Sequence, residues 1–517
     1  MLTNIVRIPF SLFIKELIRL GAQTPKDLAV AKRKIAKKNK VPCPSNIDLL
    51  KTYHELVEKG RVKKSPKIEK LLRTRPVRSL SGIVNVSVLT KPYPCPGKCI
   101  YCPYQKGVPK SYLKNEPAVM RAILNKYNPY KQVKMRLRAL KITGHPTDKI
   151  ELRIIGGTWS YYPKKYQEWF IKRCFDACNS VQKPDLCTAQ KLNEGAKHRI
   201  VGLSIETRPD FINEAEIKRL RKLGVTMVEL GVQSIYNDIL KLNKRGHGVK
   251  ETIKATKLLK DAGFKVLYQM MLNLPGSTLK KDLKMFKEIF SNPDFRPDLL
   301  KIYPCALLKN TLLYKWWKEE KYKPYTDQQL INLVKEIKRF IPYYVRIQRI
   351  TRDIPSHSIV SGPAKISNLR QVLARKTKCK CIRCREIKAD YNPKEKLYLF
   401  RQDYQASDGK ELFISFENKN RTKLHSLLRL RITSQNLAII REIHTYGQQL
   451  PVDGGSTAII SPQHKGLGKK LIKEAEKIAK KEFGAKNITV ISGVGVRGYY
   501  RQLGYRLENT YMTKILL

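Results

Sequence analysis

Short apolar runs recur through the middle of the chain, and each is followed by a stretch with the periodicity of an amphipathic helix. The runs occupy residues 83–89, 150–155, 200–205, 227–231, 266–271 and 299–303. Near-continuous apolar runs are typical of parallel strands that are buried on both faces. Their alternation with helices predicts βα units, and six units predict an α/β domain built as a partial (β/α) barrel.

The pattern changes from residue 397 onward. Apolar and polar positions then alternate as in antiparallel strands, one strong helix is predicted over 472–483, and a further strand is predicted over 490–494. These elements predict a second domain, of the α+β class. The core-facing side of its helix is expected to hold Leu471, Ala475 and Ile478.

The amino-terminal part of the chain is strongly basic. Residues 1–80 contain 20 Lys and Arg but only 6 Asp and Glu, with the densest runs at 32–40 and 61–78. Apolar residues at helical spacing between these charges predict a small helical module that binds phosphate groups, and a solvated basic tail is the alternative. The apolar positions are Ile5, Leu12, Leu17 and Ile18.

A chain of 517 residues is too long for one hydrophobic core, so several domains are expected. We divide it into a basic segment (1–80), a barrel domain (81–360), a linker (361–396) and the α+β domain (397–517). The whole chain carries 103 Lys and Arg against 43 Asp and Glu, a net charge of +60. Such an excess predicts an anionic partner, foremost nucleic acid, and a general compositional bias is the alternative.

Eleven cysteines, an odd number that includes two tight groups, favour metal sites in a reducing cytoplasm over disulfides. The first group, Cys95, Cys99 and Cys102, lies in a loop rich in proline at C-x3-C-x2-C spacing. Three thiolates can hold a [4Fe-4S] cluster and leave one iron open for chemistry. A zinc knuckle or unrelated cysteines are the alternatives.

The second group, Cys379, Cys381 and Cys384, has C-x-C-x2-C spacing among basic residues. Three soft ligands within six residues predict structural Zn2+ with a fourth ligand that the sequence does not identify, and free surface cysteines are the alternative. The chain has no apolar run of about 20 residues, so no membrane span is predicted.

Polar and glycine residues follow several of the predicted strands. Because sites in such barrels lie at the carboxyl ends of the strands, these tails are candidate binding residues. Glycines there allow a ligand to approach the backbone, and a carboxylate can bind a ribose hydroxyl. The candidates are Gly156, Gly157 and Thr158 after the second run, Glu206 after the third and Gln233 after the fourth.

The cysteine loop, with Tyr101 before its last cysteine, resembles the radical-SAM superfamily, in which the open iron binds S-adenosylmethionine (SAM). The turn at 463–468 and the tyrosine-rich segment 497–505 resemble the GNAT acetyltransferases. With the strings at 206–210, 229–234 and 491–497, the chain resembles the Elongator catalytic subunit family, of the stand-alone archaeal and bacterial type. The resemblance implies a cytoplasmic tRNA uridine-34 carboxymethyltransferase. Accessory subunits are expected only if the protein is of the eukaryotic type.

This resemblance also implies roles for particular residues. Cys95, Cys99 and Cys102 would hold the cluster, while Lys164 and Tyr500 would serve acetyl-CoA catalysis. SAM would be cleaved to a 5′-deoxyadenosyl radical that takes hydrogen from the acetyl methyl, and the carbon radical would add to uridine 34 of the tRNA anticodon stem loop. Further acetyl-CoA contacts would come from Glu442, Ile443, His444, Thr445, Leu467, Gly468 and Lys469.

Two functions of other classes remain open from the residues alone. One is a protein lysine acetyltransferase with a structural iron–sulfur cluster, which would need an acidic surface for basic protein tails. The other is a non-enzymatic RNA-binding scaffold, which would leave two cofactor sites unused. The sequence does not identify the tRNA isoacceptors, the final modification, the electron donor or the oligomeric state.

Overall fold

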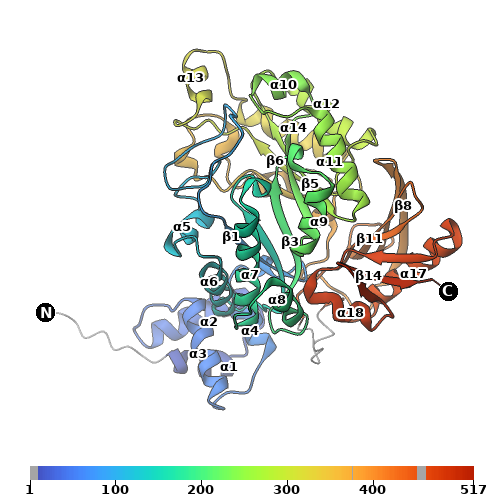
Figure 1. The fold of residues 1–517 in the computed structure, drawn as a ribbon. Helices are drawn as coiled ribbons and strands as arrows, with labels where there is room; N and C mark the ends of the chain where they lie inside the picture. The colour runs from blue at the N-terminus through green and yellow to red at the C-terminus, as the bar shows by residue number, and fades with distance from the viewer. Residues whose placement is uncertain (1–9, 375–376, 451–460, 517) are drawn as a thin grey trace.

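The structure is a computed structural model that describes residues 10–374, 377–450 and 461–516. Figure 1 shows three parts: a helical module at the amino terminus, a central barrel-like sheet and a carboxyl-terminal sheet. Within the described ranges, no helix is both long and apolar enough to cross a membrane.

Seven parallel strands form the central sheet in the order of the sequence, which makes a partial (β/α) barrel as predicted. Six of them match the predicted runs. The seventh was missed because Arg346, Gln348 and Arg349 interrupt its apolar pattern. The strands are β1 (Val84–Leu89), β2 (Lys149–Ile155), β3 (Arg199–Thr207), β4 (Met227–Gln233), β5 (Lys265–Leu272), β6 (Leu299–Pro304) and β7 (Arg346–Ile350).

Helices connect the strands and pack on the sheet around one large core. Several begin at side chains that cap their free N–H groups, as Thr326 does for α14 (Asp327–Arg339). The other helices of this part are α5 (Pro117–Leu124), α6 (Pro129–Ile142), α7 (Lys164–Asn179), α8 (Leu186–Asn193), α9 (Glu214–Lys222), α10 (Asn237–Leu242), α11 (Val249–Asp261), α12 (Leu279–Ser291) and α13 (Leu312–Lys318). Two short helices, α15 (Leu369–Ala374) and α16 (Ile382–Arg385), follow β7.

The carboxyl-terminal sheet is mixed, and its strand order is β13-β14-β12-β11-β10-β9-β8. Helix α17 (Leu467–Phe483) buries Leu471, Ala475 and Ile478 in the core of this domain, as predicted. The strand predicted over 490–494 was wrong beyond its first residue, because the chain turns into a 3-10 helix at Val494–Val496. The remaining elements are β8 (Tyr398–Ala406), β9 (Gly409–Glu417), β10 (Leu424–Ile432), β11 (Ala438–Thr445), β12 (Asn487–Val490), α18 (Arg497–Arg501), β13 (Arg506–Glu508) and β14 (Tyr511–Ile515).

The amino-terminal module contains four helices around a small core of its own. Leu17 is buried there, but Leu12 and Ile18 are 52% and 40% exposed, because Phe13 and Ile14 form the buried face instead. Ile5 lies outside the described residues. The helices are α1 (Phe10–Arg19), α2 (Pro25–Lys38), α3 (Asn46–Glu58) and α4 (Pro66–Leu72).

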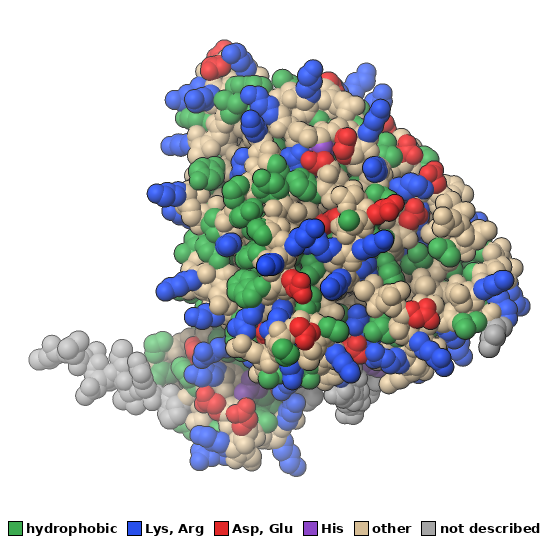
Figure 2. Space-filling model, viewed as in Figure 1, with side chains coloured by type: hydrophobic (Ala, Val, Ile, Leu, Met, Phe, Trp, Pro, Cys, Tyr) green, Lys and Arg blue, Asp and Glu red, His purple; other side chains and the backbone are tan. Residues whose placement is uncertain are grey.

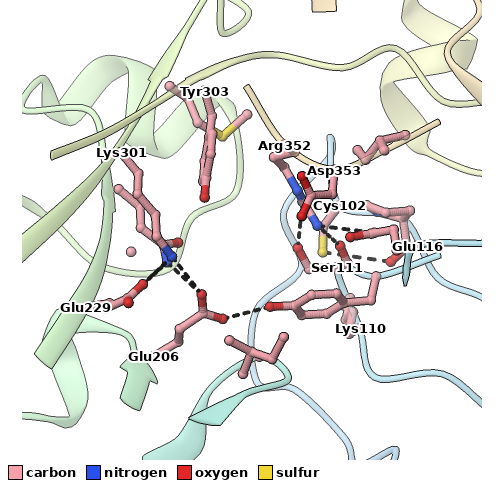
Figure 3. A pocket seen from close by; sticks show the side chains of 18 of the residues that line it. Cys102, Lys110, Ser111, Glu116, Glu206, Glu229, Lys301, Tyr303, Arg352 and Asp353 are labelled. Carbon is pink, nitrogen blue, oxygen red and sulfur yellow. Dashed lines mark hydrogen bonds and ion pairs between the residues drawn. The ribbon is translucent and has the colours of Figure 1, made fainter. Parts of the chain in front are cut away.

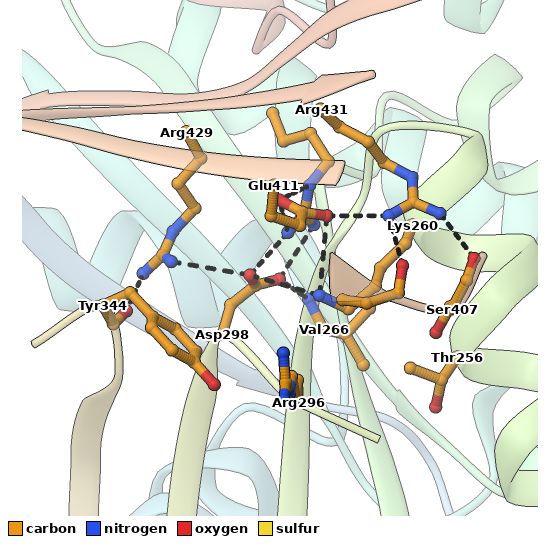
Figure 4. A network of polar contacts seen from close by, with 12 residues as sticks. Thr256, Lys260, Val266, Arg296, Asp298, Tyr344, Ser407, Glu411, Arg429 and Arg431 are labelled. Carbon is orange, nitrogen blue, oxygen red and sulfur yellow. Dashed lines mark hydrogen bonds and ion pairs between the residues drawn. The ribbon is translucent and has the colours of Figure 1, made fainter. Parts of the chain in front are cut away.

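A buried network of charges joins the barrel to the carboxyl-terminal sheet (Figure 4). Asp298, which precedes β6, accepts hydrogen bonds from Arg441 of β11 at 2.5 and 2.9 Å. Arg441 also pairs with Glu411 of β9 at 3.0 Å, and Arg431 pairs with Asp261 of α11 at 2.6 Å. Because these groups are removed from water, each depends on its partners, and the network fixes how the two domains sit together.

Candidate functional site

The three cysteines of the first group lie in the loop between β1 and α5, and all three line a cavity of 430 Å³ at the carboxyl ends of the barrel strands. Gly97 lies between them. A Cβ atom at Gly97 would stand 2.8 Å from Arg208 Nη1 and 3.6 Å from the sulfur atoms of Cys95 and Cys99. A larger residue at this position would press on the Arg208 guanidinium and touch both sulfur atoms.

The surroundings of these cysteines fit a cluster with thiolate ligands. Arg245 donates from Nη1 to the sulfur of Cys99 at 3.4 Å. Burial alone would raise the pKa of Cys99, but Arg245 holds it below its usual value. Burial and the neighbouring Cys99 raise the pKa of Cys102 to about 12, so this thiol needs a bound metal to ionise.

The second group differs in spacing. Cys379, Cys381 and Cys384 have sulfur atoms within 4.8 Å of one another, and across the described ranges they are the one group of metal-ligand type that meets this spacing. That spacing suits one small ion. The described cysteines of the β1–α5 loop do not all lie within this limit.

Other candidates also reach the cavity. Gly157, Thr158, Glu206 and Gln233 line it, and Gln233 has a left-handed backbone with φ 70°. Gly156 does not line it: a Cβ there would stand 1.9 Å from Thr90 Oγ1, so this glycine is needed for packing behind the site.

A pair of carboxylates and a lysine form the floor of the cavity (Figure 3). Lys301 contacts Glu229 and lies 3.2 Å from Glu206, which also accepts a hydrogen bond from Tyr112 at 2.8 Å. Burial opposes ionisation of Glu206, but Lys301 and Tyr112 lower its pKa. Glu206 is therefore held as a carboxylate that can accept hydrogen bonds from a ligand.

A second set of expected residues meets in the carboxyl-terminal domain. Leu467, Gly468 and Lys469 begin α17, directly after a turn with Gly466 at φ 76°. A Cβ at Gly468 would stand 2.9 Å from Tyr499 Oη and 3.6 Å from Ile443 Cδ1. The start of α17 is thus close to β11 and α18, and its free N–H groups suit an anion such as a pyrophosphate.

Comparison with known proteins identifies relatives of the barrel domain and of most of the chain. Residues 93–289 match the model of the Radical SAM superfamily, and residues 297–378 match the model of the Radical_SAM C-terminal domain. The tRNA uridine(34) acetyltransferase of Methanocaldococcus jannaschii is 47% identical over 498 residues, with 92% of this chain and 90% of the relative covered. Elongator complex protein 3 of Schizosaccharomyces pombe is 40% identical over 479 residues, with 86% of this chain and 87% of the relative covered.

The chain belongs to the Elongator complex protein 3 family. A solved structure of the archaeal Methanocaldococcus infernus Elp3, which lacks residues 1–46, superposes with a TM-score of 0.74 at 44% identity and covers 85% of this chain and 100% of that one. The family resemblance drawn from the sequence is confirmed, together with the radical-SAM half-barrel followed by a mixed-sheet domain.

Within this family member, several residues expected to contact acetyl-CoA have other partners. Glu442 pairs with Arg429 at 2.7 Å and with Lys265 of the barrel at 3.1 Å. His444 Nε2 lies 2.7 Å from the carbonyl oxygen of Ser81. These side chains therefore hold β11 against the barrel, and a coenzyme at this strand would meet its backbone. Thr445 Oγ1 likewise lies 2.9 Å from Ser426 Oγ.

Lys164 and Tyr500 differ in their settings. Lys164 is the first residue of α7, is exposed and does not line the cavity. The ring of Tyr500 is buried between Tyr499 and Tyr505. Burial raises the pKa of Tyr500, so its hydroxyl stays protonated and can act as a donor.

Sequence reasoning assigned no role to most of the charged residues that line the cavity, among them Arg245, Lys301 and Arg352. Arg352 donates to Ser111 Oγ at 3.0 Å and lies 3.6 Å from Glu116. Lys301 carried a usable signal, because a lysine inside a buried apolar strand is rare without a partner. Arg245 and Arg352 lie in loops.

Proposed function

We propose that this protein modifies uridine 34 of tRNA with a carboxymethyl group taken from acetyl-CoA, by radical-SAM chemistry. The observation that carries the proposal is the convergence of the cysteine loop, Thr158 and Glu206 on one cavity, in a chain 47% identical over 498 residues to a protein named tRNA uridine(34) acetyltransferase. When bound, a [4Fe-4S] cluster with SAM supplies a 5′-deoxyadenosyl radical that can take hydrogen from the acetyl methyl.

The candidate residues of the two domains have distinct tasks in this proposal. Cys95, Cys99 and Cys102 hold the cluster, and Arg245 stabilises one of the thiolates. Glu206, kept ionised by Lys301, accepts a hydrogen bond from a ribose hydroxyl of SAM. The hydroxyl of Tyr500 donates toward the thioester end of acetyl-CoA, while Lys164 steadies the anionic coenzyme from the exposed start of α7.

The tRNA would be held by basic residues beside the cavity. Arg121 of α5 lines the cavity. Burial lowers the pKa of Arg136 on α6, and the nearby charges of Arg78 and Arg121 lower it further. Among the described residues, these three arginines form no salt bridge with a carboxylate, so their charge is free for an anion. Figure 2 shows Lys and Arg side chains along the edge of the molecule that carries α5, with few acidic ones there. Phosphates of the anticodon stem loop suit this surface.

Cys379, Cys381 and Cys384 are proposed to bind one Zn2+ ion, because their sulfur atoms lie within 4.8 Å of one another. The ion would fasten α16 to the barrel, where Cys381 and Ile382 belong to the main core. Purified protein should contain about one zinc per chain, and a Cys381→Ser variant should lose it. Zinc retained in full by that variant would overturn the assignment.

Nucleoside mass spectrometry tests the main proposal. Reconstituted protein, given acetyl-CoA, SAM, a reductant and unmodified tRNA, should form 5-carboxymethyluridine at position 34. A tRNA with cytidine at position 34 is the control and should remain unmodified. Absence of the product, with acetylated lysine found on added protein instead, would favour the acetyltransferase alternative.

A further inference from the structure

Helix α13 is fixed to the cysteine loop by backbone contacts. The N–H of Leu313 donates to the carbonyl oxygen of Ile100 at 3.0 Å, and Asn310 Nδ2 donates to the carbonyl oxygen of Tyr104 at 2.8 Å. Leu313 is fully buried in a cluster that also includes Ile100 and Leu307. The helix therefore has a defined position at the rim of the cavity.

Three large aromatic side chains of this helix keep part of their surface exposed: Tyr314, Trp316 and Trp317. The rings of Tyr314 and Trp317 stack on each other with centroids 5.7 Å apart and an angle of 26° between the planes. Lys318 Nζ lies 5.2 Å from the centroid of the Tyr314 ring. The result is a stacked aromatic pair beside a cation at the protein surface.

The segment around the helix is also basic. Residues 309–323 contain five lysines and two glutamates, and Glu319 is paired with Lys321 at 2.9 Å. Below α13, the edge of the molecule shows many Lys and Arg side chains (Figure 2). Exposed aromatics within a positive surface are the features with which proteins bind single-stranded nucleic acid, since bases stack on the rings while phosphates meet the cations.

We propose that Tyr314 and Trp317 form a platform on which one unpaired base of the substrate RNA stacks. The nucleotide next to that base would then enter the cavity. The inference rests on the proposed function, since it takes the RNA to be the anticodon loop. Two arguments favour a base over an apolar protein partner. The surrounding charge is positive, and the aromatic pair is held next to the cysteine loop, which lines the cavity that an unpaired nucleotide would enter. The platform would position the strand and take no part in the chemistry.

Binding of a 2-aminopurine-labelled anticodon stem loop tests the platform. Loss of one stacking contact should weaken binding about 5- to 150-fold. The affinity of Trp317→Leu and that of Tyr314→Leu should each fall by a factor in this range. Trp317→Phe keeps an aromatic ring and should keep most of the affinity. The fluorescence quenching seen with the unchanged protein should disappear in Trp317→Leu. The salt dependence of binding should not change, because stacking releases no counterions.

Tyr398→Leu is the matched control, since Lys396 lies 5.6 Å from the Tyr398 ring on the outer strand β8 of the other domain. It should bind as the unchanged protein does. A fully paired RNA of equal charge should bind equally to all variants. Unchanged stem-loop affinity in both Leu variants, or an equal loss for paired RNA, would overturn the platform. If either of these results is found and the unchanged protein still modifies tRNA, the platform is refuted while the proposed function stands.

Discussion

Replacement of Asp298 by asparagine should weaken the junction between the two domains. Asp298 is fully buried and faces three positive groups: Arg441 at 2.5 Å, Arg429 at 3.5 Å and Lys260 at 3.8 Å. It also accepts the N–H of Val266 at 2.8 Å. In Asp298→Asn the charge is lost, and an amide N–H group is placed against guanidinium donors.

The size of the effect follows from this geometry. Breaking a buried ion pair costs about 3–5 kcal/mol, because the remaining charges lose their compensation. A surface pair contributes only about 0–1 kcal/mol. Asp390 forms such a pair with Lys423 at 3.0 Å, and its side chain is 83% exposed, so Asp390→Asn is a control that removes the same charge.

Urea unfolding at pH 7, followed by tryptophan fluorescence, measures the difference. Asp298→Asn should lower the free energy of unfolding by about 3–5 kcal/mol, and Asp390→Asn by less than about 1 kcal/mol. Equal stability of the two variants would refute the reasoning that this buried network holds the domains together.

Three further changes give separate tests. Burial lowers the pKa of Lys260 from its ordinary value of 10.5 to about 8. Between these pH values the unfolded chain binds more protons than the folded chain, so the free energy of unfolding should rise with pH. Lys260→Met should abolish that rise, and an unchanged pH profile would contradict this reading. Arg136→Gln should reduce tRNA affinity and lower the slope of log K against log salt by roughly 0.7–0.9, whereas an equal slope would exclude a phosphate contact. Tyr500→Phe should slow acetyl-CoA hydrolysis with little effect on stability, and full hydrolysis would make Tyr500 a core residue only.

The sequence predicted the barrel because buried apolar residues recur in each of its first six strands, as at Val84, Val86 and Val88 of β1. It failed at β7, where Arg346 and Arg349 interrupt the apolar pattern. The partner of Arg346 is Glu386, 40 positions away in the sequence, which only the fold brings near. The cysteine groups were predictable because metal binding constrains spacing along the chain. The contact of Arg245 with Cys99 and the Asp298–Arg441 pair were not predictable, because the two residues of each pair lie far apart in the sequence. The separations are 146 and 143 positions.

The central claim is that the two domains act on one substrate, acetyl-CoA. Acetyl-CoA deuterated on its methyl group tests it most directly, in a reaction with SAM, reductant and tRNA. The account predicts deuterium in the 5′-deoxyadenosine produced, in an amount that falls in a Lys164→Ala variant. Formation of 5′-deoxyadenosine without deuterium during active turnover would contradict it.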